Sequence, residues 1–249
     1  MKDIFAIYKR VGETPLQALD RVRFENGEFL RDAKLSYAGR LDPLAQGVML
    51  VLKDEANKER DQYLQYDKSY YFDVLFGVGS DSYDPLGLVK KGSTPTFDLQ
   101  KKLEMKLSKL RNIKKIQYPP FSSKTVDGRP LFCWAREGRS FTLPKREIRI
   151  YEFEITRMEW IPFYILRNTA YDKISRVKGD FRQREVYRHW QILEKEIGDL
   201  EKTFPVARFY IKASTGTYVR SLAHRIGKEC GTSALAFHIV RTSVGPFSL

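Results

Sequence analysis

A run of five consecutive apolar residues between Gly47 and Lys53 constrains this chain more than any other feature, because these side chains have to be buried together. Runs of this length next to turn residues are typical of buried strands. The loop before the run begins at Gly39 and contains Pro43, so its shape is restrained. Asp42 lies between a leucine and that proline, where a carboxylate is poorly solvated. Asp42 has either a structural role, in a local turn or as a helix cap, or a functional role. The motif alone leaves both open.

The composition indicates a folded protein. The chain has 249 residues, of which 42% are hydrophobic, enough for a substantial core in one domain spanning residues 1–249. No apolar run approaches the roughly 18 residues that a membrane span requires. The N-terminus lacks the layout of a signal peptide. We therefore expect a cytoplasmic protein that makes no membrane contact.

Charge and cysteine content narrow the possible partners. Cys133 and Cys230 have no histidine or cysteine nearby at metal-ligand spacing, so we expect no metal site. The net charge is +13, and the chain has 14 Tyr, 16 Phe and 3 Trp. Basic side chains displace counterions from phosphates, and aromatic rings stack on unpaired bases. This combination favours RNA as the partner, although a merely basic surface is the alternative.

Strand and helix patterns alternate along the whole chain, which predicts an α+β fold with a large mixed sheet. The predicted strands cover residues 3–8, 47–53, 68–76, 147–159, 162–171 and 206–213, with a bulge in the fourth. Helices are predicted to begin at the hydroxyl caps Thr14 and Thr96 and at a capping box formed by Asp180 and Gln183, and to cover residues 55–65 and 217–230.

The chain has neither a glycine-rich phosphate loop nor a serine nucleophile elbow. The remaining polar candidates are Asp42, the tyrosine-rich strand around Tyr70, and residues 214–220. Arg220 falls in the first turn of a predicted helix, where the helix dipole disfavours a cation. This cost suggests an anionic partner, and Asp42 is the attractive one. A structural salt bridge or a phosphate contact is the alternative.

These stretches together resemble the tRNA pseudouridine synthase B (TruB) family. The family's catalytic loop reads Gly-His-Thr-Gly-x-Leu-Asp-Pro-Leu-Ala-x-Gly, and residues 36–47 here read Ser-Tyr-Ala-Gly-Arg-Leu-Asp-Pro-Leu-Ala-Gln-Gly. The resemblance continues in the same order through most of the chain, at residues 57–58, 68–70, 77–84, 118–131, 216–223 and 239–241.

The resemblance implies a pseudouridine synthase fold, with a mainly antiparallel sheet and a central RNA-binding cleft. It also implies that the T-loop uridine of tRNA, position 55 in tRNA nomenclature, is flipped out and isomerised to pseudouridine without a cofactor. Asp42 would act at the sugar C1′ as nucleophile or charge partner, held by Arg220. Tyr70 would pack against the base and serve as acid or base. The implied supporting residues are Tyr218 and Ile239 around the base and Lys58 nearby.

The region from Tyr118 to Gly138 resembles the family's RNA-gripping loop, and the residues in it suited to phosphate contacts are Lys124, Arg129, Arg136 and Arg139. We therefore expect the T arm of tRNA as the partner, bound by a monomer that needs no other protein. A synthase for another uridine, or a tRNA-folding chaperone without catalysis, is the alternative.

Two features depart from the family pattern. Tyr37 replaces the family's histidine; it can stack and wedge the RNA loop, but it carries no charge at neutral pH. Family members usually carry a small C-terminal RNA-binding domain of the PUA type, whereas this chain ends at Leu249. A basic insertion at about 160–200 either replaces part of the tRNA grip or covers the sheet through Trp190 and Leu193.

Overall fold

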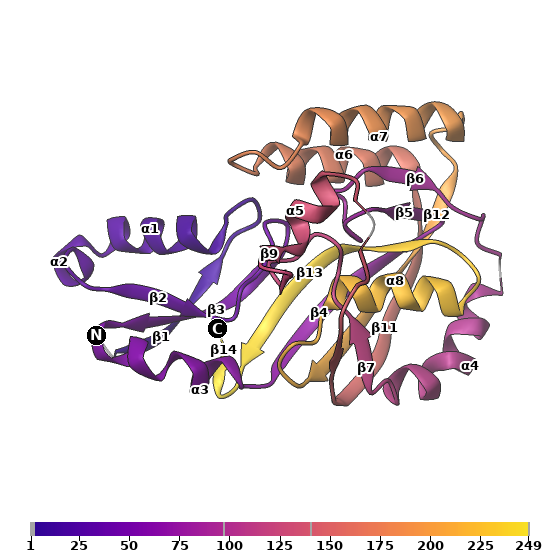
Figure 1. The fold of residues 1–249 in the computed structure, drawn as a ribbon. Helices are drawn as coiled ribbons and strands as arrows, with labels where there is room; N and C mark the ends of the chain where they lie inside the picture. The colour runs from indigo at the N-terminus through magenta and orange to yellow at the C-terminus, as the bar shows by residue number, and fades with distance from the viewer. Residues whose placement is uncertain (1–2, 97, 140, 249) are drawn as a thin grey trace.

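The computed structural model describes residues 3–96, 98–139 and 141–248; Met1, Lys2, Phe97, Ser140 and Leu249 lie outside the described part. Its centre is an eight-stranded sheet in the order β1-β3-β13-β4-β12-β11, with β2 beside β3 and β14 beside β13 (Figure 1). Of these pairs, β13 with β3 is parallel and the others are antiparallel. The predicted α+β class and mainly antiparallel sheet are confirmed. The strands are β1 Ile4–Lys9, β2 Leu35–Ala38, β3 Gln46–Lys53, β4 Lys68–Phe76, β11 Ile150–Pro162, β12 Thr203–Ala213, β13 Ala234–Val244 and β14 Phe247–Ser248.

Helices and short hairpins surround this sheet. The helices are α1 Pro15–Glu25, α2 Gly27–Leu30, the 3₁₀ helix η1 Asp54–Glu59, α3 Arg60–Leu64, α4 Leu99–Arg111, α5 Leu131–Arg136, α6 Phe163–Ser175, α7 Gln183–Ile197 and α8 Val219–Glu229. Short two-stranded pairs are formed by β5 Val78–Ser80 with β6 Val89–Lys91, β7 Lys115–Gln117 with β10 Lys145–Glu147, and β8 Thr125–Val126 with β9 Arg129–Pro130.

Both faces of the central sheet are covered. Alternation along β4 sends Phe72 to one face, where it joins an apolar cluster with Leu222 of α8 and residues of α4. Leu75 points to the other face and packs in a cluster with Leu166 of α6 and Trp190 of α7. Helices α6 and α7 therefore lie across the sheet from α8, as Figure 1 shows.

The N-terminal strands form the end of the sheet beside α1. Thr14 caps this helix as predicted: its hydroxyl accepts from the Gln17 amide at 3.3 Å, and the Gln17 side chain accepts from the Thr14 amide at 2.8 Å. Where β3 meets β13, the backbone leaves no room for a side chain at Gly47. A Cβ there would lie 2.1 Å from the Arg241 carbonyl, and its φ is +111°. The glycine is thus a steric requirement of this strand junction.

The prediction of a strand at 162–171 is wrong. Strand β11 ends at Pro162, and helix α6 begins at the next residue. Phe163, Leu166 and Ala170 are buried at spacings of three and four residues, which suits a helix packed on one face of a sheet. A short apolar run does not separate the two structures by periodicity alone. The helix predicted over 55–65 is divided into η1 and α3.

Two predicted helix caps are also wrong. Helix α4 has Asp98 rather than Thr96 at its N-cap. Helix α7 has Arg182 at its N-cap, with a φ of +59° and no side-chain cap, and the Gln183 side chain accepts from the Phe181 amide instead. The predicted bulge is confirmed, since the β11–β12 register shifts between Ile150 and Glu152.

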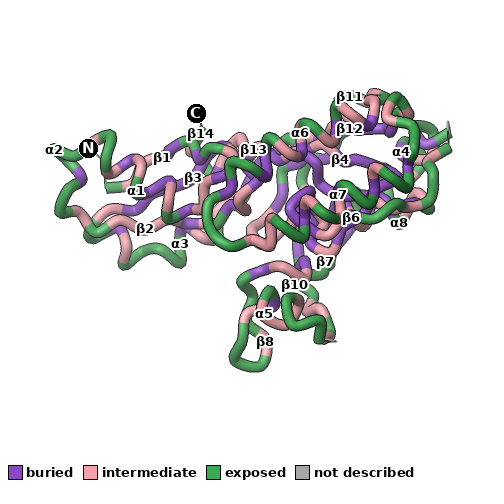
Figure 2. Tube along the Cα trace, turned by 90° about the horizontal axis from the view of Figure 1, so that it is seen from above, coloured by how far each residue is buried: buried purple, intermediate pink, exposed green. Residues whose placement is uncertain are grey.

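Residues 118–139 and 141–144 belong to a projecting arm that contains the predicted gripping loop. Its base is the β7–β10 pair, where the Tyr118 amide donates to the Pro144 carbonyl at 3.0 Å. Figure 2 shows β8 and α5 standing out from the body of the protein. Within the described ranges, no helix is long and apolar enough to cross a lipid bilayer.

Candidate active site

Asp42 and Arg220 form a bidentate ion pair, as the sequence predicts. The Nε and Nη2 atoms of Arg220 donate to Oδ2 and Oδ1 of Asp42 at 2.7 and 2.9 Å. Arg220 lies in the first turn of α8 and is buried, whereas 35% of the Asp42 side chain is exposed. The carboxylate is therefore fixed in direction by a planar fork and still open to a ligand.

The other donors of Arg220 bind segments far away in the sequence. Its Nη1 donates to the Ser82 carbonyl at 2.8 Å, and its Nη2 donates to the Phe121 carbonyl at 3.1 Å. Burial alone would lower the pKa of this guanidinium, but Asp42 and Asp84 outweigh burial and raise it. Arg220 therefore stays charged and joins the Asp42 loop, the loop after β5 and the start of the projecting arm.

Asp84 is a second carboxylate beside Arg220. Its Oδ2 lies 3.6 Å from the Arg220 Nε, and its Oδ1 accepts from the Ser82 hydroxyl at 2.6 Å and the Leu86 amide at 3.0 Å. Complete burial raises the pKa of Asp84 to about 6 in spite of these partners. Of the two carboxylates, only Asp42 is exposed enough to meet a substrate. Asp84 is buried and stabilises the charge of Arg220.

Two buried cations hold the loop that carries Asp42. The Lys9 ammonium donates to the Ala45 carbonyl at 2.7 Å and the Pro43 carbonyl at 3.2 Å, and burial lowers its pKa to about 8. The Arg241 guanidinium donates to the carbonyls of Gly39 and Val48 at 3.0 and 2.7 Å. The loop backbone is thus tied to β1 and β13, which fixes the position of Asp42.

An apolar floor lies next to the ion pair. Tyr70 and Ile239 are buried in the same cluster as Leu41 and Ala45, which flank Asp42 in the loop. Tyr70 belongs to the side-chain phase of β4 that faces α8, so its ring lies on the same side of the sheet as Arg220. The structure thus places both predicted residues in the apolar cluster that the Asp42 loop joins.

Aromatic rings line its outer side. The rings of Tyr218 and Tyr118 lie with centroids 4.9 Å apart, and the Lys124 ammonium sits 5.9 Å from the Tyr118 ring centroid. Burial, with Tyr118 and Asp42 nearby, raises the pKa of Tyr218 to about 12, so its hydroxyl remains a hydrogen-bond donor. Tyr218 and Lys124 therefore both lie against the Tyr118 ring, and Tyr218 is also close to Asp42.

Tyr37 and Arg129 have other partners. The Tyr37 hydroxyl accepts from Arg40 at 3.2 Å, and Arg40 also bonds the Ser123 hydroxyl, which links the Asp42 loop to the arm. Arg129 pairs with Glu137 and lies 4.9 Å from the Trp134 ring.

Lys58 is not brought to the site. Its side chain is 76% exposed on η1, and its ammonium pairs with Glu55 at 2.5 Å.

Sequence reasoning gave no role to Lys9, Asp84 or Phe121. The sequence does indicate that Lys9 is buried, because Lys9 follows Ile7 at a spacing of two on β1 and so lies on the buried phase of that strand. For Asp84 and Phe121 the deciding contacts are tertiary, and no local pattern reveals them.

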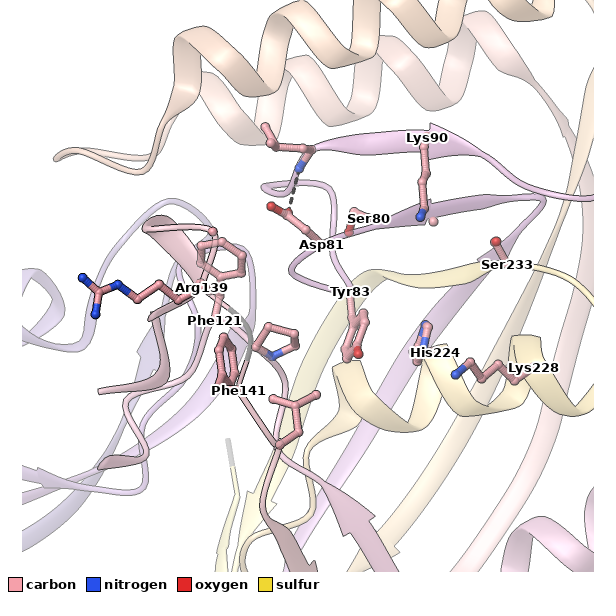
Figure 3. A pocket seen from close by; sticks show the side chains of 16 residues that line it. Ser80, Asp81, Tyr83, Lys90, Phe121, Arg139, Phe141, His224, Lys228 and Ser233 are labelled. Atoms are coloured by element: carbon pink, nitrogen blue, oxygen red, sulfur yellow. Dashed lines mark hydrogen bonds between the residues drawn. The ribbon is translucent and has the colours of Figure 1, made fainter. Parts of the chain in front are cut away.

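A cavity of about 690 Å³ lies beyond Phe121, between the arm, the β5–β6 hairpin and α8. Tyr83 and His224 are stacked in its wall with ring centroids 4.0 Å apart, and Asp81 and Phe121 also line it (Figure 3). Asp42 is not part of its lining, so this cavity is separate from the Asp42 site.

Residues 28–170, more than half of the chain, match the TruB family pseudouridylate synthase N-terminal domain. The chain belongs to the TruB family. Proteins described as tRNA pseudouridine synthase B match across its length. The one from Fusobacterium nucleatum is 30% identical over 100% of this chain and 70% of its own, and the one from Caldicellulosiruptor saccharolyticus is 27% identical over 100% and 69%. The one from Caldanaerobacter subterraneus is 27% identical over 87% of this chain and 61% of its own.

Solved structures agree on the fold. A chain of a Cbf5-Nop10-Gar1 complex has a TM-score of 0.56 at 18% identity, covering 98% of this chain and 49% of that one. A chain of an H/ACA RNP bound to a substrate RNA containing 2'-deoxyuridine has a TM-score of 0.54 at 17% identity, covering 98% and 48%. This TruB family chain thus spans about half the length of those chains and 61% to 70% of the relatives named above.

Proposed function

We propose that this chain is a tRNA pseudouridine synthase that isomerises the T-loop uridine at position 55. The observation that carries the proposal is the half-exposed Asp42 carboxylate, fixed by the bidentate fork of Arg220 beside the apolar floor of Tyr70 and Ile239. Family membership and relatives described as tRNA pseudouridine synthase B support it.

The chemistry matches these residue types. The N1–C1′ bond of uridine breaks, the detached uracil turns, and a C5–C1′ bond forms. The C5 proton is lost and N1 gains one, so the product has the same atoms and oxidation level as the substrate. Asp42 acts at C1′ as nucleophile or charge partner while the base is detached. Arg220 keeps the carboxylate aimed at the sugar.

The neighbouring rings hold the base during this rearrangement. Tyr70 forms the floor against which the uracil packs and serves as acid or base, and Ile239 and Tyr218 bound the same space. A uridine inside a folded loop has to leave its stack to reach Asp42, which costs a few kcal/mol. Contacts of Tyr37 with the RNA loop, and of Lys124 and Arg129 with phosphates, offset that cost.

The test is the substitution Asp42→Asn, assayed on T-arm RNA with the purified chain alone, since we propose that no protein partner is needed. Asparagine keeps the size of the side chain and removes its charge. Pseudouridine formation, measured by mass spectrometry of digested RNA, should fall below detection, while RNA affinity stays within about threefold of wild type.

A T-arm RNA with cytidine at position 55 is the matched substrate control and should yield no pseudouridine. If the wild type forms no pseudouridine in any T-arm RNA but anneals tRNA, the chaperone alternative holds. If it modifies a uridine outside the T loop instead, the proposed position is wrong.

A further inference from the structure

The connection between α6 and α7, residues 176–182, contacts the projecting arm at two points. The Arg182 guanidinium lies 4.2 Å from the centroid of the Phe121 ring. The Arg136 guanidinium, on α5, donates to the Asp180 carbonyl at 2.6 Å and lies 3.3 Å from its Oδ2. A cation over an aromatic face and an ion pair thus join the insertion to the arm.

Arg182 is itself held firmly. Its φ of +59° is a left-handed conformation that non-glycine residues adopt only where the surroundings enforce it. The Asp180 carboxylate accepts from the Arg182 amide at 3.1 Å, and the Gln183 side chain donates to the Gly179 carbonyl at 2.7 Å. The Arg182 guanidinium also pairs with Asp81 at 3.0 Å, so its position over Phe121 is fixed from both sides.

Phe121 connects this contact to the candidate active site. Its carbonyl accepts from Arg220 Nη2, the same nitrogen that donates to Asp42 Oδ1. Figure 3 shows the Phe121 side chain in the cavity wall together with Asp81, the other partner of Arg182. A displaced Phe121 would take away one acceptor of Arg220 and loosen the fork that aims Asp42.

The other end of the connection approaches the Asp42 loop. A Cβ on Gly12 would lie 2.5 Å from the Arg176 carbonyl, so the two backbones are in close contact. The Gly12 amide donates to the Pro43 carbonyl at 2.9 Å. The connection therefore contacts the start of the arm directly and reaches the loop around Asp42 through Gly12.

We propose that residues 176–182 are a brace that holds the arm and the Asp42 loop in register, and that Arg182 is its positioning residue. The brace acts within the protein rather than on RNA phosphates, because Arg182 is mostly buried against Phe121 and Asp81. Its consequence for catalysis rests on the proposed function, whereas its effect on the arm does not.

The first test follows amide hydrogen exchange in the free protein, so it needs no activity. Arg182→Gln should speed exchange at least about tenfold in residues 118–136 and leave the β4 amides unchanged, since local opening exchanges amides independently of the core. Lys195→Gln, which removes an exposed charge from the following helix α7, is the matched control and should change neither. Unchanged exchange in the arm of Arg182→Gln would overturn the brace.

The second test measures single-turnover pseudouridine formation at saturating T-arm RNA. Arg182→Gln should lower the rate about tenfold, because small displacements of catalytic groups are costly, with RNA affinity and its salt dependence unchanged. Arg182→Lys keeps the pair with Asp81 and should recover part of the rate. Weaker RNA binding with a reduced salt slope and a normal saturated rate would show a phosphate contact instead. An inactive wild type with faster arm exchange in Arg182→Gln would refute the proposed function and leave the brace standing.

Discussion

Arg220 does at one position what two lysines could not do. Its planar fork faces both oxygens of Asp42, and its remaining donors reach the carbonyls of Ser82 and Phe121. A lysine is a point charge with a tetrahedral donor set, so it could pair with Asp42 but could not fix the carboxylate plane at the same time. The arginine is therefore required for direction as much as for charge.

A second carboxylate–guanidinium fork, on the opposite sheet face, contributes to stability at acid pH. Arg208 donates to both oxygens of Asp73 at 2.7 and 2.9 Å, and His238 Nδ1 lies 3.6 Å away. Burial alone would raise the pKa of Asp73, but these partners outweigh it and lower the pKa to about 2. The folded state therefore binds this proton less readily than the unfolded state, and the fork stabilises the fold above pH 4 and ceases to do so near pH 2.

Asp73→Asn should accordingly lower the free energy of unfolding by about 2 kcal/mol at pH 7. The difference from wild type should shrink as the pH falls from 4 to 2, because wild-type Asp73 then becomes neutral as well. Urea unfolding at pH 7, 4 and 2.5 measures this. Asp61→Asn, an exposed carboxylate on α3, should show no such trend. A constant gap across this pH range would contradict the assignment.

Residue types alone suggested an anionic partner for Arg220, because the helix dipole disfavours a cation in a first helical turn, and they left a phosphate contact open beside the pair with Asp42. They were not enough for Lys58, whose motif position matches the family while its side chain points into solvent. Asp84 was equally hidden, since its importance comes from complete burial beside Arg220, and burial of a loop residue is a tertiary property.

At the scale of elements, α7 was predictable and α6 was not. Val186, Trp190, Leu193 and Ile197 follow one face at spacings of four and three, and all four are buried. In α6 the first four residues, Phe163 to Leu166, are all apolar, so the pattern also fits a strand. The helical form is favoured because it packs Phe163, Leu166 and Ala170 on the sheet face that carries Leu75. This packing is a tertiary contact, so the local sequence does not reveal it.

Trp190 links α7 to the loop of Asp84. Its side chain is fully buried, and its Nε1 donates to the Pro85 carbonyl at 3.1 Å. Trp190→Ala should lower the free energy of unfolding by about 3–5 kcal/mol, through lost transfer energy and the cavity left behind. Ile192→Ala, on the exposed side of α7, should change it by less than about 0.5 kcal/mol. Equal effects in urea unfolding would show that α7 does not pack as described.

At the scale of the molecule, the basic side chains behind the net charge of +13 differ in their partners and in the face on which they lie. Arg129 pairs with Glu137 in the arm and Arg136 pairs with Asp180, whereas Lys124 has no carboxylate partner among the described residues. Arg184 and Arg188 are exposed on α7, across the sheet from α8 and Tyr70. RNA held at Asp42 is therefore expected to meet the arm rather than α7.

This placement predicts the salt dependence of T-arm binding. Lys124→Gln should reduce the slope of log affinity against log salt by about 0.7–0.9, the value for one phosphate contact. The double substitution Arg184→Gln and Arg188→Gln removes twice the charge and should leave the slope unchanged. Deleting the insertion is not a clean test, because it would remove Trp190 and Leu193 and so uncover the sheet face around Leu75. A reduced slope in the α7 double variant would instead support the insertion as part of the grip.

The Arg220 guanidinium is where positions 42, 82, 121 and 220 of the chain meet. No contiguous fragment that stops short of α8 can contain this junction, however well its strands fold. Under the proposed function, a polypeptide emerging during synthesis cannot fix the direction of the Asp42 carboxylate until α8 has been made and has packed against the earlier segments.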